Sequence, residues 1–334
     1  MSHFTVMVIT DARPSDEALA EILQPWHEYE CTGVDDQYVV DVDVTDEVMS
    51  SWAETTEVVK LADGTMKSRY AAEFYVEEGT GWDKKRTFVQ PAGTEIVTIS
   101  RCELAAIEGE TLAEWAKDYH GYVMNAEGRF IRRTNPNRKW DWWVIGGRWS
   151  GLLKMKVGIK PLRGRPGAFG NEPEAGHGDM AMLSEIDIDG MRTAAAERAG
   201  ELWDKARAAA ADCEIPLSWD KVREAGPTIE EARTAYWAQP AIVAIKSAFP
   251  EQFDIDEEIA ALSVSREEAC AAAADGALTT YAVVKDGKWY EKGQMGWFGM
   301  SHGEMSQSDW NRQTAELLAG LAPTTWLTIV DCHI

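Results

Sequence analysis

Apolar runs at the two ends of the chain predict its first and last strands. Residues 4–9 are apolar and β-branched, and residues 326–334 close the chain with a similar run. Ser15 can cap a helix that continues to about Leu23. Residues 38–44 alternate apolar and acidic side chains, which is typical of a strand with one exposed face. The first segment is therefore predicted to fold as strand, helix and strand.

Two β-hairpins are predicted where strand-like arms flank turn residues. Residues 122–131 surround a turn that contains Gly128, and residues 280–290 surround Asp286-Gly287. A segment rich in Trp and Gly follows each hairpin. The two regions are therefore either a degenerate internal duplication or two independent hairpins, and the sequence leaves both readings open.

The remaining elements outside the middle of the chain rest on shorter patterns. They are strand pieces at residues 70–76, 86–89 and 95–99, a helix from the capping box of Thr111 and Glu114 to Gly121, and a helix that Ser306 or Ser308 caps.

The middle of the chain differs in amino-acid composition from the two ends. Residues 161–190 are rich in Gly and Pro and have little apolar periodicity, which predicts an extended loop. Such a loop is either a passive connector or a lid over a neighbouring site. The next stretch is rich in Ala and predicts helices at about 191–212, 228–237 and 266–275.

Together these patterns predict an α+β fold: a mixed sheet with hairpins and packed helices, interrupted by an Ala-rich helical insertion. The expected division is a mixed α+β domain from residues 1–160 and 277–334, a Gly/Pro-rich loop at 161–190 and the helical insertion at 191–276.

Composition indicates a globular protein that does not engage a membrane. The 334 residues are 45% hydrophobic, which is enough to bury a substantial core. No run of about 18 apolar residues occurs, and the first ten residues lack the pattern of a signal peptide. We therefore expect a cytoplasmic protein. Its five Cys residues form no Cys-x-x-Cys pair and are expected to be reduced thiols.

Charge is unevenly distributed along the chain. The net charge is −23, yet residues 129–165 hold 11 of the 33 Lys and Arg residues and a single acidic residue, Asp141. Four of the 15 Trp residues lie inside this basic island, within the ten positions 140–149. Cations beside flat rings suit a ligand that is both anionic and aromatic. Nucleic acid is disfavoured, because the acidic remainder repels phosphates beyond the island.

The Trp residues of the island have two interpretations. If residues 139–145 form a strand, Trp140 and Trp142 face one way and Trp143 faces the other. The rings then either fill the core on both sides of the sheet or leave one or two exposed for stacking on a ligand. Trp149, Arg138 and Lys139 belong to the same candidate site.

Gly146-Gly147-Arg148 offers a second feature for an anionic ligand. Glycine lets the backbone approach a phosphate closely, although the same pair also fits a bulge or tight turn. Arg148 suits a bidentate contact with a phosphate or, equally, with Asp141.

Familiar catalytic and metal motifs give little support. The phosphate loop of nucleotide hydrolases, the dinucleotide-binding glycine motif, Gly-x-Ser-x-Gly and His-Glu-x-x-His are all absent. Metal or thiol chemistry would require two groups of residues to converge. These are His27, Glu28, Glu30 and Cys31 near the start and Asp331, Cys332 and His333 at the end. Their spacing matches no zinc module, so we expect no metal and no cofactor.

Four segments carry a resemblance to a known family. They are His27-Glu-Tyr-Glu-Cys-Thr-Gly33, residues 135–149, Lys288-Trp-Tyr-Glu-Lys-Gly-Gln-Met-Gly-Trp297 and Ile329-Val-Asp-Cys-His-Ile334. Spread over roughly the whole chain, they resemble a family of accessory proteins encoded mainly by tailed bacteriophages. The resemblance implies a viral protein acting in the bacterial cytoplasm and supplies no catalytic residues.

Three classes of function therefore stay open. We favour a protein that binds a small phosphorylated aromatic, nucleotide-like ligand, which in a phage accessory protein suggests sequestration of a host immune signal. The alternatives are an enzyme acting on such a ligand, with His120, Asp141 or His302 as acid–base groups, and a protein-binding inhibitor of a host factor anchored by Trp and Arg.

Overall fold

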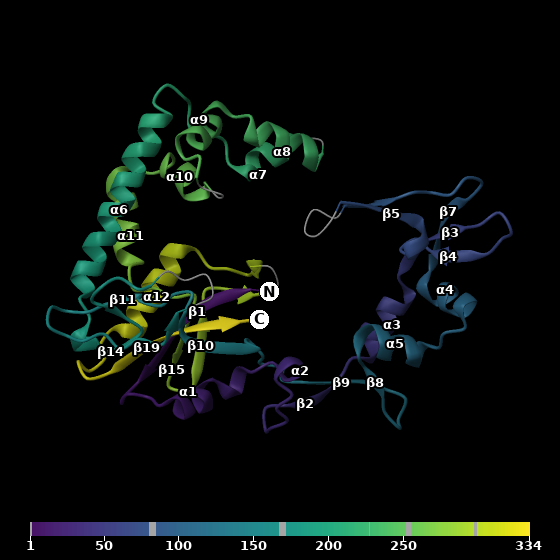
Figure 1. Cartoon of the computed structure of the whole chain (residues 1–334), viewed down its shortest axis with the longest axis horizontal. Helices are drawn as coiled ribbons and strands as arrows, with labels where there is room; N and C mark the ends of the chain where they lie inside the picture. The colour runs from purple at the N-terminus through teal and green to yellow at the C-terminus, as the bar shows by residue number, and fades with distance from the viewer. Residues whose placement is uncertain (1, 80–84, 167–171, 227, 252–254, 297–298) are drawn as a thin grey trace. The chain divides into compact units, whose positions relative to one another are not determined.

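The computed structural model describes residues 2–79, 85–166, 172–226, 228–251, 255–296 and 299–334 (Figure 1). Contacts divide the chain into two compact units. The larger unit holds Met1–His27 and Lys139–Ile334, and the smaller unit holds Glu28–Arg138. This division differs from the expected one, which kept residues 1–160 together. Residues 28–138 form their own unit because their strands and helices pack mainly against one another.

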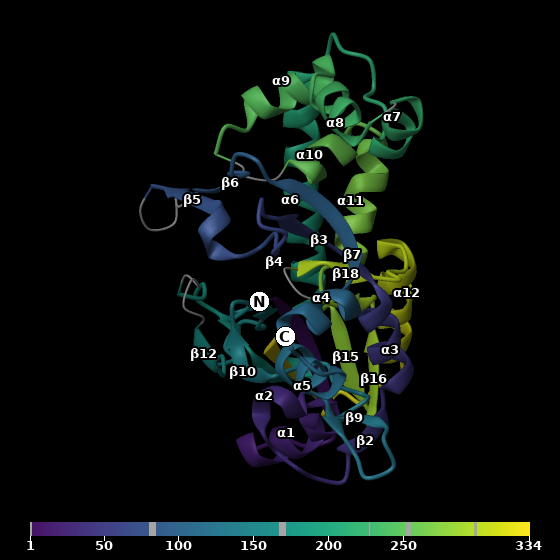
Figure 2. The ribbon, with the colours of Figure 1, turned by 90° about the vertical axis from the view of Figure 1, so that its right-hand side faces the viewer.

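A seven-stranded mixed sheet forms the centre of the larger unit. Its strands are β1 (His3–Thr10), β10 (Trp142–Gly147), β12 (Arg165–Pro166), β14 (Met180–Met182), β15 (Ala282–Lys285), β16 (Lys288–Glu291) and β19 (Trp326–His333). The order is β12-β10-β19-β1-β15-β16, and β14 pairs with β19 next to β10. The first and last strands are antiparallel neighbours along their whole length, so the two chain ends lie side by side (Figures 1 and 2). The predicted α+β class and the predicted terminal strands are confirmed.

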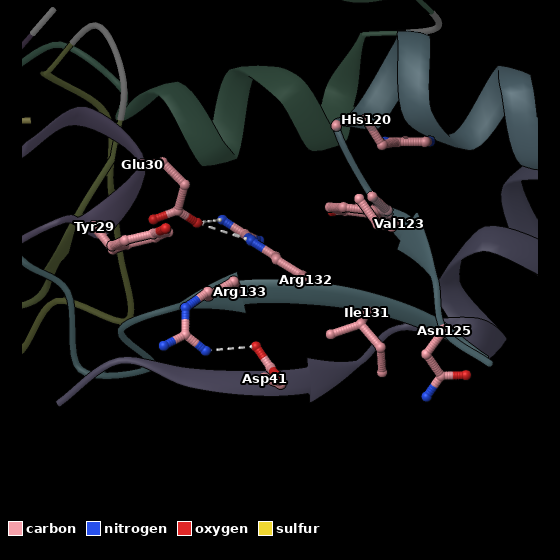
Figure 3. A pocket seen from close by; sticks show the side chains of 11 residues that line it. Tyr29, Glu30, Asp41, His120, Val123, Asn125, Ile131, Arg132 and Arg133 are labelled. Carbon is pink, nitrogen blue, oxygen red and sulfur yellow. Dashed lines mark hydrogen bonds and ion pairs between the residues drawn. The ribbon is translucent and has the colours of Figure 1, made fainter. Parts of the chain in front are cut away.

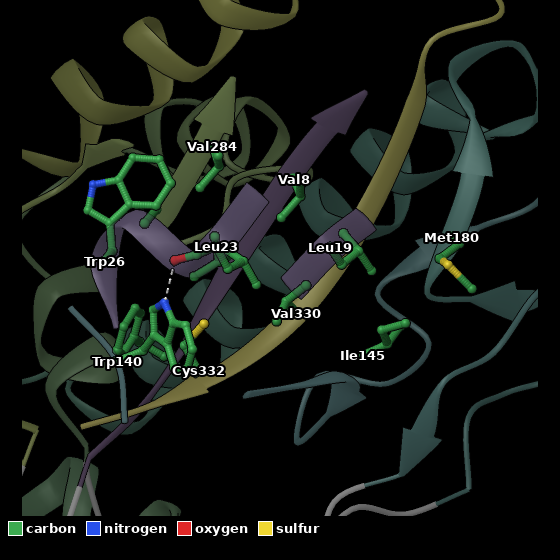
Figure 4. Packing of buried hydrophobic residues seen from close by; sticks show 13 residues of the cluster. Val8, Leu19, Leu23, Trp26, Trp140, Ile145, Met180, Val284, Val330 and Cys332 are labelled. Carbon is green, nitrogen blue, oxygen red and sulfur yellow. Dashed lines mark hydrogen bonds between the residues drawn. The ribbon is translucent and has the colours of Figure 1, made fainter. Parts of the chain in front are cut away.

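Two cores cover the two faces of this sheet. On one face, alternate β1 residues Phe4, Val6 and Val8 pack against Leu19 and Leu23 of α1 (Asp16–Leu23), as Figure 4 shows in part. On the other face, Met7 and Ile9 pack with Trp310 of α12 (Gln307–Leu318). Because both faces are covered, the central strands carry apolar residues on both faces.

The Ala-rich region folds into helices with a core of their own. They are α6 (Ile188–Ala209), α7 (Trp219–Ala225), α8 (Ile229–Trp237), α9 (Pro240–Ala248), α10 (Asp256–Ala261) and α11 (Arg266–Asp275). Helices α6 and α11 run along each other in both views (Figures 1 and 2). Ile242, Ile245 and Leu262 are fully or almost fully buried in the helical core. The three predicted helices are present within three residues of their expected bounds; α7, α9 and α10 were not predicted.

Residues 161–190 contain more structure than the expected loop. Besides β12 and β14, they include β13 (His177–Gly178), which pairs with β11 (Leu153–Lys154), and the short 3₁₀ helix η4 (Leu183–Glu185). Strand formation here depends on distant partners, since β14 pairs with the C-terminal strand. Residues 167–171 of this segment lie outside the described residues. The hairpin of residues 280–290 is confirmed as β15 and β16. The β17 (Gln294–Met295) and β18 (Ser301–His302) pair follows it, and Trp297 of the family-like segment lies outside the described residues.

The smaller unit is built from short strands and helices. Its helices are α2 (Tyr29–Thr32), α3 (Thr45–Ala53), α4 (Arg101–Glu108), α5 (Leu112–His120) and the 3₁₀ helix η2 (Ala72–Phe74). Its strands are β2 (Val40–Asp43), β3 (Thr55–Lys60), β4 (Met66–Ser68), β5 (Tyr75–Glu78), β6 (Lys85–Phe88), β7 (Glu95–Ser100), β8 (Val123–Met124) and β9 (Phe130–Thr134).

Local signals predicted part of this unit. The hairpin of residues 122–131 is confirmed as β8 and β9, and Thr111 and Glu114 form the predicted capping box of α5. Residues 70–76 are not one strand, because η2 covers Ala72–Phe74 and β5 begins only at Tyr75. Helices α3 and α4 were not predicted.

Candidate functional site

The basic island is divided between the two units, because their boundary falls inside it. Arg129, Arg132, Arg133 and Arg138 belong to the smaller unit, and Lys139 and the later residues of the island belong to the larger one. The two parts of the island therefore have different neighbours.

In the smaller unit, nearby carboxylates neutralise the island. Strand β9 pairs with the acidic strand β2. Arg132 lies 2.7 Å from Glu30, and Arg133 lies 2.6 Å from Asp35 and 2.8 Å from Asp41. Arg138 lies 3.5 Å from Glu28. These ion pairs balance the positive charge that the sequence concentrates here.

A hollow of about 700 Å³ lies beside these pairs (Figure 3). Tyr29, His120, Tyr122, Arg132 and Arg133 are among its lining residues. Both arginines are drawn bonded to carboxylates of the same hollow, and the His120 ring stacks on Tyr122 at 5.0 Å. Its charge is therefore balanced from within, which gives an anion little net attraction.

The four Trp residues of the island have different environments. Trp140 is buried, and its indole N–H donates to the Leu23 carbonyl at 2.9 Å (Figure 4). Trp143 packs against the same core, and Trp149 packs against the core of the other sheet face. Trp142 is 48% exposed.

The predicted strand of residues 139–145 has the wrong bounds. Strand β10 begins at Trp142 and extends to Gly147, and Trp140 makes only an isolated bridge with His27. The alternation expected from Trp140 onwards therefore fails, and Trp140 shares a core with Trp143. Lys139, just before it, pairs with Glu291 at 2.6 Å.

Gly146 and Gly147 form a tight turn around two buried carboxylates. Both have positive φ angles, +80° and +54°. A Cβ atom on Gly147 would lie 2.3 Å from the Asp331 side chain, and one on Gly146 would lie 2.4 Å from Asp179 Oδ2. The Arg148 N–H donates to Asp331 Oδ2 at 2.9 Å. The close approach that these glycines permit is thus to carboxylates of the protein itself.

Asp179 holds the rest of this turn. It is fully buried and accepts bonds from the Gly151 N–H at 2.5 Å, the Gly164 N–H at 2.7 Å and the Ser150 hydroxyl at 2.9 Å. Sequence reasoning missed Asp179, since its donors are 15 to 29 residues away and no motif marks it. Asp331 left a signal in the sequence, because it is an acidic residue in the terminal strand beside the candidate ligands Cys332 and His333.

The turn presents Arg148 to a pocket of about 520 Å³ in the larger unit. Arg148, Lys154, His177 and Arg198 line it, and they come from the β10 turn, β11, β13 and α6. Lys154 also lies 3.3 Å from Asp187, and Glu172 and Glu174 contribute acidic groups to the lining. Four basic side chains from separate segments therefore converge on one pocket.

Of the nine predicted site residues, Arg148 lines this pocket. The other eight, Arg138, Lys139, Trp140, Trp142, Trp143, Gly146, Gly147 and Trp149, are absent from its described lining. Lys154 lies in the basic island but was not singled out, and His177 and Arg198 could not be found from sequence because they lie 29 and 50 residues after Arg148.

The candidate acid–base and metal groups lie in different parts of the structure. His120 is in the smaller unit, His302 is exposed on β18, and Asp141 accepts a bond from His333 Nδ1 at 2.6 Å. His27 is buried, and Glu30 of the smaller unit is paired with Arg132. Cys332 points into the core on one face of the sheet, and Asp331, the preceding residue of β19, points to the other face. The complete burial of Cys332, followed by the charges of Asp331 and Asp141, raises the pKa of its thiol well above the usual range.

Comparison of the chain with known protein families, curated proteins and solved structures gives no match in any of the three. Among the described helices, none is both long and apolar enough to cross a membrane.

Proposed function

We propose that the protein binds a small phosphorylated, nucleotide-like ligand in the pocket beside Arg148. The observation that carries this proposal is the convergence of Arg148, Lys154, His177 and Arg198 on one pocket in a chain with a net charge of −23. Arginine forks and lysine ammonium groups are the usual partners of phosphate oxygens.

The dimensions and charge of the pocket favour a small ligand. Its volume of about 520 Å³ falls in the range of small-molecule sites and suits a nucleotide. Glu172 and Glu174 in the lining, together with the acidic remainder of the chain, oppose a long polyanion. A compact phosphorylated compound feels mainly the local positive field.

The aromatic part of the ligand would be recognised separately from its phosphate. The described lining of this pocket contains no Phe, Tyr or Trp. Trp142 lies on the strand that leads into the Arg148 turn, and its half-exposed ring offers a stacking surface. The resemblance to phage accessory proteins favours a host signalling nucleotide as the ligand, which the protein would remove from its receptor.

Isothermal titration calorimetry against mononucleotides, cyclic dinucleotides, NAD derivatives and inorganic phosphate tests the proposal. Replacing Arg148 with Ala should weaken binding by about 1.5 to 3 kcal/mol, or about 10- to 150-fold, because a charge-assisted contact with phosphate is lost. Arg198→Ala should weaken binding in the same direction.

Arg133→Ala is the matched control, since this arginine comes from the same basic island but is bonded to Asp35 and Asp41. Its affinity should equal that of the unaltered protein. Absence of binding to every compound would sink the proposal, and equal losses in the Arg148 and Arg133 variants would move the site out of this pocket.

A further inference from the structure

Three aromatic rings gather at one end of the central sheet of the larger unit. The register of β1 and β19 places His3 directly opposite His333, and the register of β10 and β19 places Trp142 opposite His333 on the other side. The two imidazole centroids are 4.8 Å apart, and Trp142 lies 5.6 Å from His3 and 6.0 Å from His333.

Each of the two histidines is bonded to a carboxylate through its own Nδ1 atom. His3 Nδ1 lies 2.9 Å from Asp331 Oδ1, and His333 Nδ1 lies 2.6 Å from Asp141 Oδ1. A carboxylate only accepts, so each Nδ1 carries a proton and each neutral ring keeps Nε2 as its basic atom. The same carboxylate stabilises the ring when Nε2 becomes protonated.

The pair is both held in place and accessible. Asp331 is 1% exposed, whereas the His3 and His333 side chains are 16% and 14% exposed beside the open ring of Trp142. Asp331 also accepts the Arg148 N–H through its second oxygen. One buried carboxylate thus bonds both His3 and the backbone of a residue that lines the proposed ligand pocket.

We propose that His3 and His333 form a two-histidine acid–base site that hydrolyses a phosphodiester bond of the bound ligand. The inference rests on the proposed function for its substrate. It extends that function from capture to turnover and assigns Trp142 as the stacking surface for a base next to the reacting phosphate.

The step balances with water as the only co-reactant. Nε2 of one neutral histidine accepts a proton from water as the water oxygen forms a bond to phosphorus. Nε2–H of the other, protonated histidine donates to the bridging oxygen as the bond between phosphorus and that oxygen breaks. The products are a phosphomonoester and an alcohol, and proton exchange with solvent resets both rings. A diester is the fitting class because its alkoxide leaving group needs the donated proton.

Turnover of cyclic dinucleotides and of bis(p-nitrophenyl) phosphate provides the test, with products followed by phosphorus NMR and absorbance. His3→Ala and His333→Ala should each lower kcat on cyclic dinucleotides about 10²- to 10⁴-fold. The two substrates then separate the roles. The variant that lacks the general acid should keep more activity on bis(p-nitrophenyl) phosphate, since p-nitrophenolate leaves without a proton.

Arg266→Ala is the control, because Arg266 lies in the same unit, is bonded to Asp204 and is absent from the pocket lining, so it should leave turnover unchanged. Asp141 is a positioning residue. Asp141→Asn should lower kcat while KM and the Tm remain those of the unaltered protein, whereas a merely structural role would lower the Tm.

The outcomes distinguish this inference from the proposed function. If calorimetry shows binding but the ligand is recovered intact after hours with the unaltered protein, turnover is overturned and binding stands. Hydrolysis that persists in the double variant of His3 and His333 also overturns the two-histidine site. Absence of both binding and hydrolysis overturns the two proposals together.

Discussion

The two parts of the basic island end in different surroundings. In the smaller unit, Arg132 and Arg133 lie among Glu30, Asp35 and Asp41, and each guanidinium is paired. In the larger unit, the turn that carries Arg148 brings it to a pocket with three further basic groups. The partner strands and turns, not the density of charge along the sequence, decide which cationic side chains gather at a pocket. Strand β2, Val-Asp-Val-Asp, supplies a carboxylate at every second position opposite β9.

The largest effect that would sharpen this contrast is expected at Asp179. Asp179→Ala leaves three part-buried donors without their partner, two of them in the Arg148 turn. The larger unit should lose about 3 to 5 kcal/mol of unfolding free energy. Asp35→Ala, which removes a half-exposed partner of Arg133, should have a far smaller effect.

Urea unfolding followed by tryptophan fluorescence measures both variants. Comparable losses for Asp179→Ala and Asp35→Ala would show that the buried carboxylate does not hold the turn. The contrast between a structurally fixed cationic pocket and a surface of ion pairs would then fail.

The next largest effect on stability is expected from substituting either of two glycines with alanine. Gly147 and Gly128 both have positive φ, +54° and +78°, so an added Cβ strains either backbone by about 1 to 2 kcal/mol. Gly128, in the β8–β9 turn, has nothing within 4 Å of that Cβ, whereas at Gly147 it would collide with Asp331. Gly147→Ala should therefore cost more than Gly128→Ala and should also weaken ligand binding.

Thermal unfolding and calorimetry on the two variants decide the matter. If Gly147→Ala binds ligand as tightly as Gly128→Ala does, the position of Asp331 does not control the Arg148 turn, and the pocket must be organised in another way.

Sequence reasoning succeeded where a structure depends on a few neighbouring residues. The Ser15 cap of α1, the Thr111–Glu114 capping box of α5 and the tight turn at Asp286-Gly287 are all present. Each of these signals acts over about four residues, so the chemistry can be read directly from the chain.

Sequence reasoning failed where the partners are far apart. The β2–β9 pairing joins residues about 90 positions apart, and it turns part of a basic island into a set of ion pairs. His3 and Asp331 are 328 positions apart, so their bond could be inferred only after pairing the terminal strands. Among the Trp residues, apolar rings occur on both faces of β10, and periodicity could not show that Trp142 alone of the four is strongly exposed.

The smallest effect concerns the ion pairs that neutralise the island in the smaller unit. Burial raises the pKa of Glu30, but bonds from Thr134, from its own backbone and from Arg132 outweigh burial and leave the pKa below its usual value. The stabilisation from this lowered pKa is therefore present above the ordinary glutamate pKa and is lost as the pH falls through the pKa of the folded protein.

Arg132→Gln removes the cation and keeps a side chain that can donate a hydrogen bond. The pKa of Glu30 should then rise towards its usual value, which carboxyl ¹³C NMR titration measures directly. Glu103, whose pKa is lowered by the backbone and hydroxyl of Ser100, is the internal control and should titrate unchanged. A pKa of Glu30 that does not move in the variant would mean that Thr134 and the backbone hold the carboxylate without Arg132. Arg132 would then be available to an anion, and the contrast between the two parts of the island would be weaker than their geometry indicates.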